Sequence, residues 1–473
     1  MKIIGRRREK DCLMQCLKSK RPEFVVVYGR RRIGKTYLIK EYFNQQFSFY
    51  ATGLTDEKMK GQLRGFGASL NEYGYEDKTV PKDWFEAFSR LRKLLESNKV
   101  YREPINNKRL VFIDELPWMD TVKSDFKSAL EYFLNSWASS QEDMILITCG
   151  SATAWIINNL LTNKKGFHNR VTRRIHLAPF TLAECEELFE LNDVVMTRKQ
   201  MIESYMFFGG VPYYLNLMDS RLSLAQNVNE MCFKEQGPLY DEYYSLFYSL
   251  FDKPEKHMAI LNALAKKKEG MTRVEIAEIK EIGGGSVLTK DLRELTECGF
   301  IRKFNTLSGG EKDAFYQIID PFTLFSIKFL ENKKFDSWNE YINSPGYNSW
   351  RGNSFEIVCF NHIDQIKAAL GISGIETREF AWRGSSENAA QIDLIISRKD
   401  GVTNLCEMKF TNESYALGAD ECEKIQNRLA QFQKESGYKD AIHVTMICGN
   451  GYKQNKYSGI IQNVILGDDL FEY

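Results

Sequence analysis

The sequence lacks the features that mark membrane, secreted and zinc-binding proteins. No stretch approaches the ~18 apolar residues of a membrane-spanning helix, and the start MKIIGRRREK holds no apolar segment long enough for a signal peptide. The 10 cysteines are scattered without a Cys-x-x-Cys pair, and the 5 histidines show no metal-ligand spacing, which argues against a disulfide scaffold and a zinc site. We therefore expect a cytoplasmic protein in a reducing compartment, with no membrane partner.

An excess of charge, internal repeats and low-complexity tracts are also absent. The chain has 64 basic and 63 acidic residues and a net charge of +1, which excludes neither nucleic acid nor protein as a partner. Hydrophobic residues make up 43% and charged residues 27%, as in ordinary globular chains, and 473 residues are too many for one hydrophobic core. We therefore expect about two to four domains.

What the sequence does contain is a phosphate-binding loop within residues 24–36, FVVVYGRRRIGKT. An apolar run typical of a strand leads into Gly29, and after four further residues Gly34, Lys35 and Thr36 precede a helical stretch. Glycines here let backbone N–H groups approach phosphate oxygens, Lys35 reaches the terminal phosphates, and the Thr36 hydroxyl ligates Mg²⁺. The pattern predicts ATP and Mg²⁺ as cofactors. The residues expected to bind them are Gly29, Arg30, Arg31, Arg32, Ile33, Gly34, Lys35, Thr36 and Tyr37.

A second apolar run, residues 109–115, ends in two carboxylates with different expected roles. Its sequence RLVFIDE is typical of a buried strand. Asp114 would hold Mg²⁺ through water or through Thr36, and Glu115 would orient and polarise the water that attacks the γ-phosphate. Downstream of a phosphate loop, this pair is a strong indication of an ATPase.

A third apolar run, residues 144–149, leads to Gly150 and Ser151. P-loop ATPases of the AAA+ kind keep a polar sensor residue beside the γ-phosphate at such a strand end. Ser151 is the first candidate for this catalytic role, and Thr148 and Thr153 are alternatives.

Residues 1–180 alternate strand-like and helix-like segments, the pattern of a parallel sheet covered by helices. Because ligands of such sheets bind at the carboxyl ends of the strands, Gly29, Asp114 and Ser151 should converge there. Residues 181–250 are helical in pattern and predict a lid. The expected strands are residues 24–28, 47–51, 109–113, 144–149 and 173–177.

Residues 251–330 are expected to form a winged helix-turn-helix. KHMAILNALAKKK is followed by TRVEIAEIK, a glycine-rich turn at 283–286, the helix-like SVLTKDLRELTECGF and the strand-like IRKF. The helix of residues 286–298 is the one that enters a major groove in DNA-binding members, and both a DNA role and a protein-contact role stay open. A linker-like region follows at 331–349. The polar face of the helix carries Thr289, Lys290, Arg293 and Glu297.

Residues 345–473 carry a second constellation. Asp393 and the pair Glu407 and Lys409 lie on two strand patterns joined by a short polar turn, and Glu356 lies in the helix before them. Glu407 and Lys409 are two residues apart in a strand and so share a face. If Asp393 faces the same way, the carboxylates can bind a divalent cation while Lys409 positions or activates water against a phosphodiester. The alternative is an exposed charged face of a β-hairpin.

This helix and hairpin resemble the PD-(D/E)XK nuclease fold of restriction-endonuclease-like domains, with Ile392 in place of the proline. The chain as a whole resembles the prokaryotic archaeal-type ATPases of the AAA+ and STAND group, whose C-terminal domain has nuclease-like features. The segments that carry this resemblance are IGR near the start, GRRRIGKT, FIDELPWM, the CGS strand end, NRVTRRIHLAPF, GGVPYYL and YQIIDPFTLF.

The family resemblance implies further site residues. Arg170 matches the family's arginine before the last core strand, a position that suits a catalytic arginine finger acting across a subunit boundary. Arg173 and Arg174 are near enough to be alternatives. Ile4, Gly5 and Arg6 would lie near the adenine.

Together these patterns predict an α/β multidomain protein that acts as an ATP-hydrolysing switch for its winged-helix and nuclease-like regions. Two alternatives stay open. One is an ATP-controlled DNA nuclease in genome defence, and the other is an ATP-gated DNA-binding or scaffold protein whose nuclease-like domain is inactive. The partners to consider are DNA, another protein and further copies of the chain.

Overall fold

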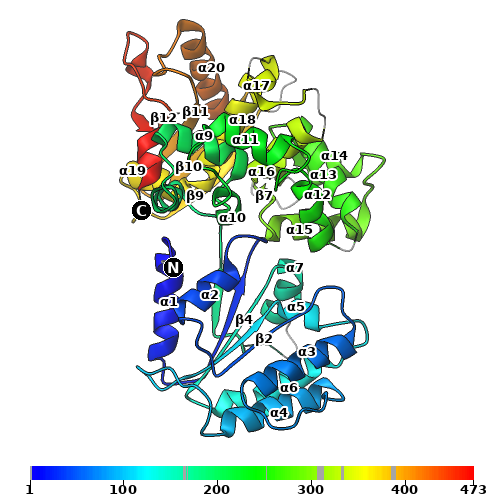
Figure 1. The fold of residues 1–473 in the computed structure, drawn as a ribbon. Helices are drawn as coiled ribbons and strands as arrows, with labels where there is room; N and C mark the ends of the chain where they lie inside the picture. Colours follow the sequence, from blue (N-terminus) through cyan, green and yellow to red (C-terminus); the bar gives the residue numbers. More distant parts are fainter. Residues whose placement is uncertain are drawn as a thin grey trace. The chain divides into compact units, whose positions relative to one another are not determined.

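The computed structural model describes residues 3–162, 167, 169–251, 253–305, 314–331, 335–342, 344–384 and 390–472. The chain divides into two compact units, Met1–Ala178 and Pro179–Tyr473, and both contain helices and a sheet (Figure 1). Within the described ranges, no helix combines the length and the apolar character needed to cross a membrane.

The first unit is built on a five-stranded parallel sheet in the order β2-β3-β4-β1-β5. Each of the five expected strands is present, and β4 lies between the phosphate-loop strand β1 and the Asp114 strand β3. The core is therefore the parallel sheet of a P-loop NTPase-like fold, as predicted. The strands are β1 (Glu23–Tyr28), β2 (Phe49–Thr52), β3 (Arg109–Asp114), β4 (Met144–Gly150) and β5 (Arg173–His176).

Helices cover both faces of this sheet (Figure 1). Val25 and Val27 of β1 pack with α1 and α2, whereas Val26 packs on the opposite side with α3, α4 and α6. A strand buried on both faces explains the uninterrupted apolar run in its sequence. The helical segments are α1 (Arg7–Lys18), α2 (Lys35–Tyr42), α3 (Met59–Glu72), α4 (Trp84–Glu96), α5 (Leu116–Met119), α6 (Phe126–Ser136), η1 (Ala138–Ser140), α7 (Thr153–Ile156) and η2 (Ile157–Leu161).

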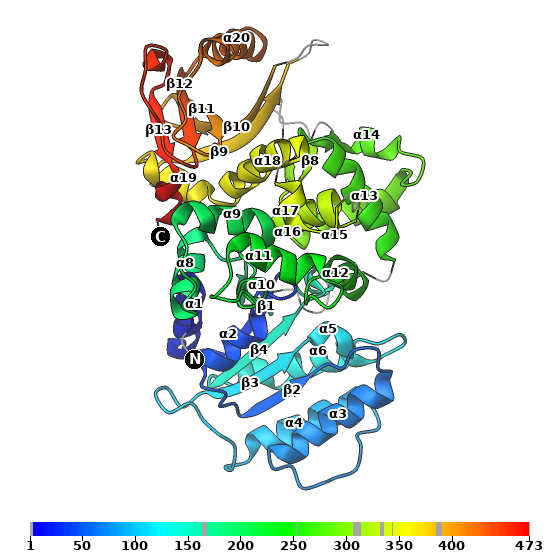
Figure 2. The ribbon, with the colours of Figure 1, turned by 45° about the horizontal axis from the view of Figure 1, so that its top comes forward.

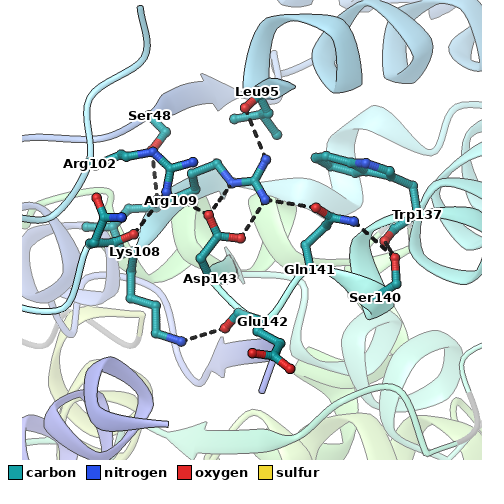
Figure 3. Close-up of polar contacts among 12 residues, drawn as sticks. Ser48, Leu95, Arg102, Lys108, Arg109, Trp137, Ser140, Gln141, Glu142 and Asp143 are labelled. Carbon is teal, nitrogen blue, oxygen red and sulfur yellow. Dashed lines mark hydrogen bonds and ion pairs between the residues drawn. The ribbon is translucent and has the colours of Figure 1, made fainter. Parts of the chain in front are cut away.

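A polar network ties the amino ends of β3 and β4 together (Figure 3). Arg109 forms a two-point ion pair with Asp143, with Nη2 2.5 Å from Oδ1 and Nε 2.9 Å from Oδ2. Burial opposes ionisation of Asp143, but hydrogen bonds from Arg109 and Arg102 outweigh it and hold its pKa below the usual value. The guanidinium of Arg109 also lies 5.3 Å over the Trp137 ring. The network therefore anchors the sheet at the end opposite the phosphate loop.

The second unit begins with helices. α8 and α9 each start with a capping box, formed by Thr181 with Glu184 and by Thr197 with Gln200. These reciprocal bonds satisfy backbone N–H groups that have no partner inside the helix. The segments are α8 (Leu182–Leu191), α9 (Arg198–Phe208), α10 (Pro212–Leu215), α11 (Leu224–Val228), η3 (Asn229–Phe233) and α12 (Glu242–Leu250).

Three helices and a small antiparallel sheet of order β6-β8-β7 follow. Gly283 and Gly285 have φ of 68° and 85° in the turn before α15, a conformation that glycine adopts without strain. The elements are α13 (Pro254–Lys266), β6 (Met271–Thr272), α14 (Arg273–Ala277), α15 (Gly285–Glu297), β7 (Ile301–Phe304) and β8 (Phe315–Ile318).

The expected linker at residues 331–349 is, in its described part, a packed segment. Trp338 and Tyr341 are 2% and 3% exposed, and Trp338 lies 4.9 Å from the ring of Phe207 and 5.1 Å from that of Phe329. The expectation was wrong because Trp338 and Tyr341 anchor a stretch in which polar residues predominate. The helical segments around it are α16 (Pro321–Phe325), η5 (Ser326–Leu330), α17 (Trp338–Tyr341), α18 (Pro345–Asn361) and α19 (Ile363–Ala369).

A second five-stranded sheet, of order β13-β12-β11-β10-β9, closes the chain (Figure 2). Strands β9 to β11 are antiparallel, and β11 to β13 are parallel. Ile425 and Phe432 of α20 pack on one face of this sheet. The elements are β9 (Thr377–Arg383), β10 (Gln391–Arg398), β11 (Val402–Lys409), α20 (Ala419–Ser436), β12 (Ala441–Cys448), η6 (Ser458–Ile460), β13 (Asn463–Leu466) and η7 (Gly467–Phe471).

Candidate functional site

The loop between β1 and α2 is shaped by its glycines. Gly29 has φ of +141°, and a Cβ at this position would lie 2.4 Å from the carbonyl oxygen of Leu177, so no other residue fits. Gly34 has φ of 86° and immediately precedes α2. Lys35 is 5% exposed, and its Nζ donates to the carbonyl oxygens of Gly29 at 2.9 Å and Arg30 at 2.8 Å. The loop therefore curls around its own lysine at the N-terminus of a helix, the arrangement that binds phosphate.

The residues expected near the adenine lie against this loop. The Arg6 guanidinium donates from Nη1 to Ala178 O at 2.7 Å and from Nη2 to Ile33 O at 3.4 Å. Ile4 and Ile33 are buried, whereas Tyr37 is 41% exposed. The fold brings the first residues of the chain to the phosphate loop, and their contact with an adenine stays a prediction.

Three donors converge on one oxygen of Asp114 at the end of β3. Oδ1 accepts the hydroxyl of Thr36 at 3.0 Å, the thiol of Cys149 at 2.6 Å and the N–H of Glu115 at 3.0 Å. Burial, with the charge of Asp114, raises the pKa of Cys149 well above its usual value, so the thiol stays protonated and donates. The oxygens of Thr36 and Asp114 are the hard ligands that Mg²⁺ prefers. Nothing in the sequence around Cys149 predicts this contact.

Glu115 is oriented by Ser151. Glu115 has a left-handed backbone with φ of 44°, and its Oε2 accepts the N–H of Ser151 at 2.9 Å and the hydroxyl at 3.0 Å. Of the two alternatives, Thr153 donates to the carbonyl of Ser151, and the buried hydroxyl of Thr148 finds no hydrogen-bond acceptor in the described chain. Among these three hydroxyls, Ser151 is the one that contacts the expected catalytic carboxylate.

Arg170 lies near the amino ends of the strands, whereas the phosphate loop follows the carboxyl end of β1. Arg170 lines a pocket with Glu23 and Met144, the first residues of β1 and β4. The six residues of β1 separate this pocket from the phosphate loop, a rise of roughly 20 Å. Arg170 is thus placed away from the phosphate loop of its own chain, and its role as an arginine finger across a subunit boundary stays a prediction. The alternatives are also engaged elsewhere, since Arg173 pairs with Glu23 and Arg174 donates to Leu161 O.

The second constellation comes together on the sheet of the second unit. Leu394 pairs with Cys406 across the β10–β11 hairpin, so Asp393 and Glu407 occupy the next pair of positions. Glu407 Oε2 lies 3.2 Å from Arg428, and Lys409 Nζ lies 2.7 Å from Glu421 Oε1. Both partners belong to α20, so Glu407 and Lys409 share a face as predicted from their spacing.

Glu356 of α18 completes this acidic cluster. It is 8% exposed, and its Oε2 has no hydrogen-bond partner among the described residues. Burial, together with the charge of Asp393, raises the pKa of Glu356, and Lys268 opposes the rise. Burial also raises the pKa of Glu407, against the charges of Arg428 and Lys409. A buried carboxylate oxygen without a donor, acted on by the charge of Asp393, is a candidate ligand for a divalent cation, although the ligand atoms of Glu356, Asp393 and Glu407 do not gather within 4.8 Å of one another in the described residues.

Two cations near this cluster have no signal in the sequence. Lys268 Nζ lies 3.4 Å from Glu356 Oε1, although the two residues are 88 positions apart. Arg302 of β7 is acted on by the charges of Asp393 and Glu356. Both residues come from the region of residues 251–330.

A buried group around His257 was also missed by sequence spacing. Ligand atoms of His257, Asp291 and Glu294 lie within 4.8 Å of one another, the one such group of three found in the described parts of the chain. Nδ1 lies 3.3 Å from Lys253 O and Nε2 lies 3.1 Å from Glu294 Oε2. Both ring nitrogens therefore already have a polar partner within the chain. The geometry therefore gives no separate reason for a metal.

Comparison with known proteins shows what the first part of the chain is similar to. Residues 4–218 match the model of a family described as an ATPase domain predominantly from Archaea. An uncharacterized protein of Methanocaldococcus jannaschii is 24% identical over 333 residues, which span 69% of this chain and 69% of that protein.

Two solved structures are similar to most of the chain. The Walker-type ATPase paby2304 of Pyrococcus abyssi aligns with a TM-score of 0.49 at 16% identity, over 69% of this chain and 96% of that chain. The ORC2 protein of Aeropyrum pernix, in complexes with ADPNP and ADP, aligns with a TM-score of 0.42 at 14% identity, over 70% of this chain and 94% of its own.

Proposed function

We propose that the archaeal-type ATPase domain of residues 4–218 binds and hydrolyses ATP with Mg²⁺, as a switch for the regions that follow it. A helical lid spans residues 181–250 and overlaps the end of this domain, and the regions that follow are a winged helix-turn-helix at 251–330 and a nuclease-like domain at 345–473, acting on DNA. One observation carries the proposal. At the carboxyl edge of the first sheet, Thr36 Oγ1 lies 3.0 Å from Asp114 Oδ1, and Glu115 is held by Ser151 one strand away.

Each residue of this edge has a part in the proposed reaction. The loop amides and Lys35 hold the phosphates, and Thr36 and Asp114 hold Mg²⁺, which neutralises charge that develops on the phosphate oxygens. Glu115, fixed by two hydrogen bonds from Ser151, orients the attacking water and accepts its proton. The thiol of Cys149 keeps Asp114 in place without competing for the metal.

Two substitutions test the ATPase. Lys35→Ala should abolish ATP binding, because the buried ammonium that the loop encloses is lost. Glu115→Gln should bind ATP normally but lower kcat about 100-fold or more, since the amide cannot accept the proton. Fluorescent-nucleotide binding and phosphate release measure the two steps. Glu142→Gln, at an exposed position, is the matched control. Normal turnover in both test variants would contradict the proposal.

A second function, metal-dependent cleavage of DNA, is supported by the cluster of Glu356, Asp393, Glu407 and Lys409. In this proposal the carboxylates would hold a divalent cation, and Lys409 positions or activates water against the phosphodiester. The protein should cut linear or circular DNA in Mn²⁺ or Mg²⁺, and Asp393→Asn should remove the cutting. Cleavage that persists in Asp393→Asn comes from elsewhere, and no cleavage of any DNA form leaves a binding role.

The polar face of α15 is relevant to the alternative function, that of an ATP-gated binding or scaffold protein. Lys290 pairs with Glu294 at 3.6 Å and Arg293 with Glu297 at 3.8 Å, so both cations of the face have acidic partners on their own helix. Direct phosphate contacts would make DNA affinity fall steeply with salt. Affinity that is absent at low salt favours a protein partner.

A further inference from the structure

The acidic cluster of the second unit is covered by cations from outside its own domain. Lys268 follows α13, and its Nζ lies 3.4 Å from Glu356 Oε1. The side chain of Lys268 is 51% exposed, whereas that of Glu356 is 10% exposed. Asp393 and Glu356 are the acids whose charges act on both Lys268 and Arg302. Positive charge from side chains that precede the cluster by many residues thus acts on its carboxylates.

Hydrogen bonds through Gln317 connect Arg302 to the Lys268 segment. The guanidinium of Arg302 lies 3.3 Å over the ring of Phe360, a residue of α18 in the turn that follows Glu356. Its Nε donates to Gln317 Oε1 at 2.9 Å, and Gln317 Nε2 donates to Lys268 O at 2.6 Å. Gln317 is 6% exposed and therefore links the Lys268 segment to the strand of Arg302. A displacement of the small sheet would carry both cations away from the acids together.

A divalent cation needs the same carboxylates. Metal ions of the Mg²⁺ class are bound through one or two carboxylate oxygens plus substrate phosphate. An ammonium at Glu356 Oε1 uses one of those oxygens and repels a second positive charge. The remaining oxygen, Oε2, is buried without a hydrogen-bond partner in the described residues, so the ammonium satisfies only half of this carboxylate.

We propose that Lys268 and Arg302 form an autoinhibitory cap on the nuclease-like domain, in which Lys268 pairs with Glu356 and Arg302 adds a second positive charge nearby, in place of a divalent cation. The inference rests on the proposed cleavage function. In this proposal the winged-helix-like region holds the cap in place, and it must move away before the cluster binds a divalent cation. Movement of that region is the kind of event that an ATPase cycle or a bound DNA can drive.

Lys268→Met in the full chain tests the cap, because the stem is kept and only the charge is lost. Mn²⁺ binding, followed by the electron paramagnetic resonance of free Mn²⁺, should become about tenfold tighter at the cluster. Adding Asp393→Asn to Lys268→Met should remove the gain and so assigns it to this site. Lys266→Met, which removes an exposed lysine of the same helix end, should bind Mn²⁺ like the wild type.

The outcomes separate the cap from the cleavage function. Tighter Mn²⁺ binding and faster DNA cutting in Lys268→Met support both. Tighter binding with no cutting supports the cap and removes the cleavage function. Unchanged or weaker Mn²⁺ binding overturns the cap. Lost cutting with unchanged Mn²⁺ affinity also overturns it, because Lys268 would then be a group that acts on the phosphodiester.

Discussion

At the scale of single residues, the nucleotide site depends on how one serine holds one carboxylate. Ser151 donates both its backbone N–H and its hydroxyl to the same oxygen of Glu115. Two bonds from one residue fix the direction of the carboxylate, which is what a residue that orients water requires. Glu115 itself sits in a left-handed conformation that few non-glycine residues adopt, so its orientation comes from these contacts and from the turn.

We predict that Ser151→Ala slows ATP hydrolysis without abolishing ATP binding. The backbone bond to Glu115 remains and the hydroxyl bond is lost, so kcat should fall about tenfold, the equivalent of one ordinary hydrogen bond. Single-turnover hydrolysis and nucleotide titration separate the two quantities. Ser136→Ala, at an exposed position at the end of α6, is the control. An unchanged kcat would show that the hydroxyl does not orient Glu115.

At the scale of elements, two contacts organise the second unit. The N–H of Phe180 donates to Gly210 O at 2.6 Å, which joins the segment before α8 to the segment after α9. His362, between α18 and α19, accepts the N–H of Leu182 at 2.9 Å through Nε2. Both contacts join segments that are far apart along the chain. The first depends on the missing side chain of Gly210, and the second depends on a neutral His362 ring.

Two glycine substitutions should have opposite effects on stability. A Cβ at Gly210 would lie 1.9 Å from the carbonyl oxygen of Phe180, so Gly210→Ala should lower the free energy of unfolding by about 2–3 kcal/mol. Gly352 lies within α18 with open space around its Cβ position, so Gly352→Ala should raise it by about 0.5–1 kcal/mol. Urea unfolding measures both, and equal effects would contradict the prediction.

Acid should weaken the second unit through His362. Burial lowers the pKa of His362 to about 4 from 6.5, and the neutral ring donates from Nδ1 to Val358 O while Nε2 accepts from Leu182. Between these values the unfolded chain binds the extra proton, so the free energy of unfolding falls as the pH falls. The expected loss is about 2 kcal/mol between roughly pH 7.5 and pH 5. Urea unfolding at the two pH values measures it.

The histidine controls make that test specific. His362→Gln should lower stability at both pH values and remove this part of the pH dependence. His443→Gln, on strand β12, should leave it in place. Equal pH dependence in wild type and His362→Gln would assign the acid sensitivity to other groups.

At the scale of the whole molecule, the switch proposal requires that nucleotide binding to the first unit change the conformation or dynamics of the second. ATP analogue with Mg²⁺ should slow amide exchange in residues 24–36 and 109–115, where the phosphates and metal bind. It should also change exchange in residues 254–304, which include Lys268 and Arg302. Hydrogen exchange with mass spectrometry measures this, and Lys35→Ala is the control. A response confined to the first unit would leave an ATPase without a switch.

The local sequence was sufficient to predict the parallel sheet, the phosphate loop and the position of the Asp114-Glu115 pair at a strand end. In each case the information is contiguous, since an apolar run predicts a buried strand and the residues that follow it carry the chemistry. The common face of Glu407 and Lys409 followed in the same way from the two-residue period of a strand. Such features depend on backbone geometry, which neighbouring residues dictate.

Long-range packing set the rest, because it joins side chains that no spacing relates. It selected Ser151 over Thr148 and Thr153 as the partner of Glu115, brought the thiol of Cys149 to Asp114, and put Arg170 at the far edge of the sheet. Packing also buried Trp338 in a stretch that reads as a linker and brought Lys268 to Glu356 across 88 residues. Burial and charge pairing act through space, so these contacts exist only in the folded chain.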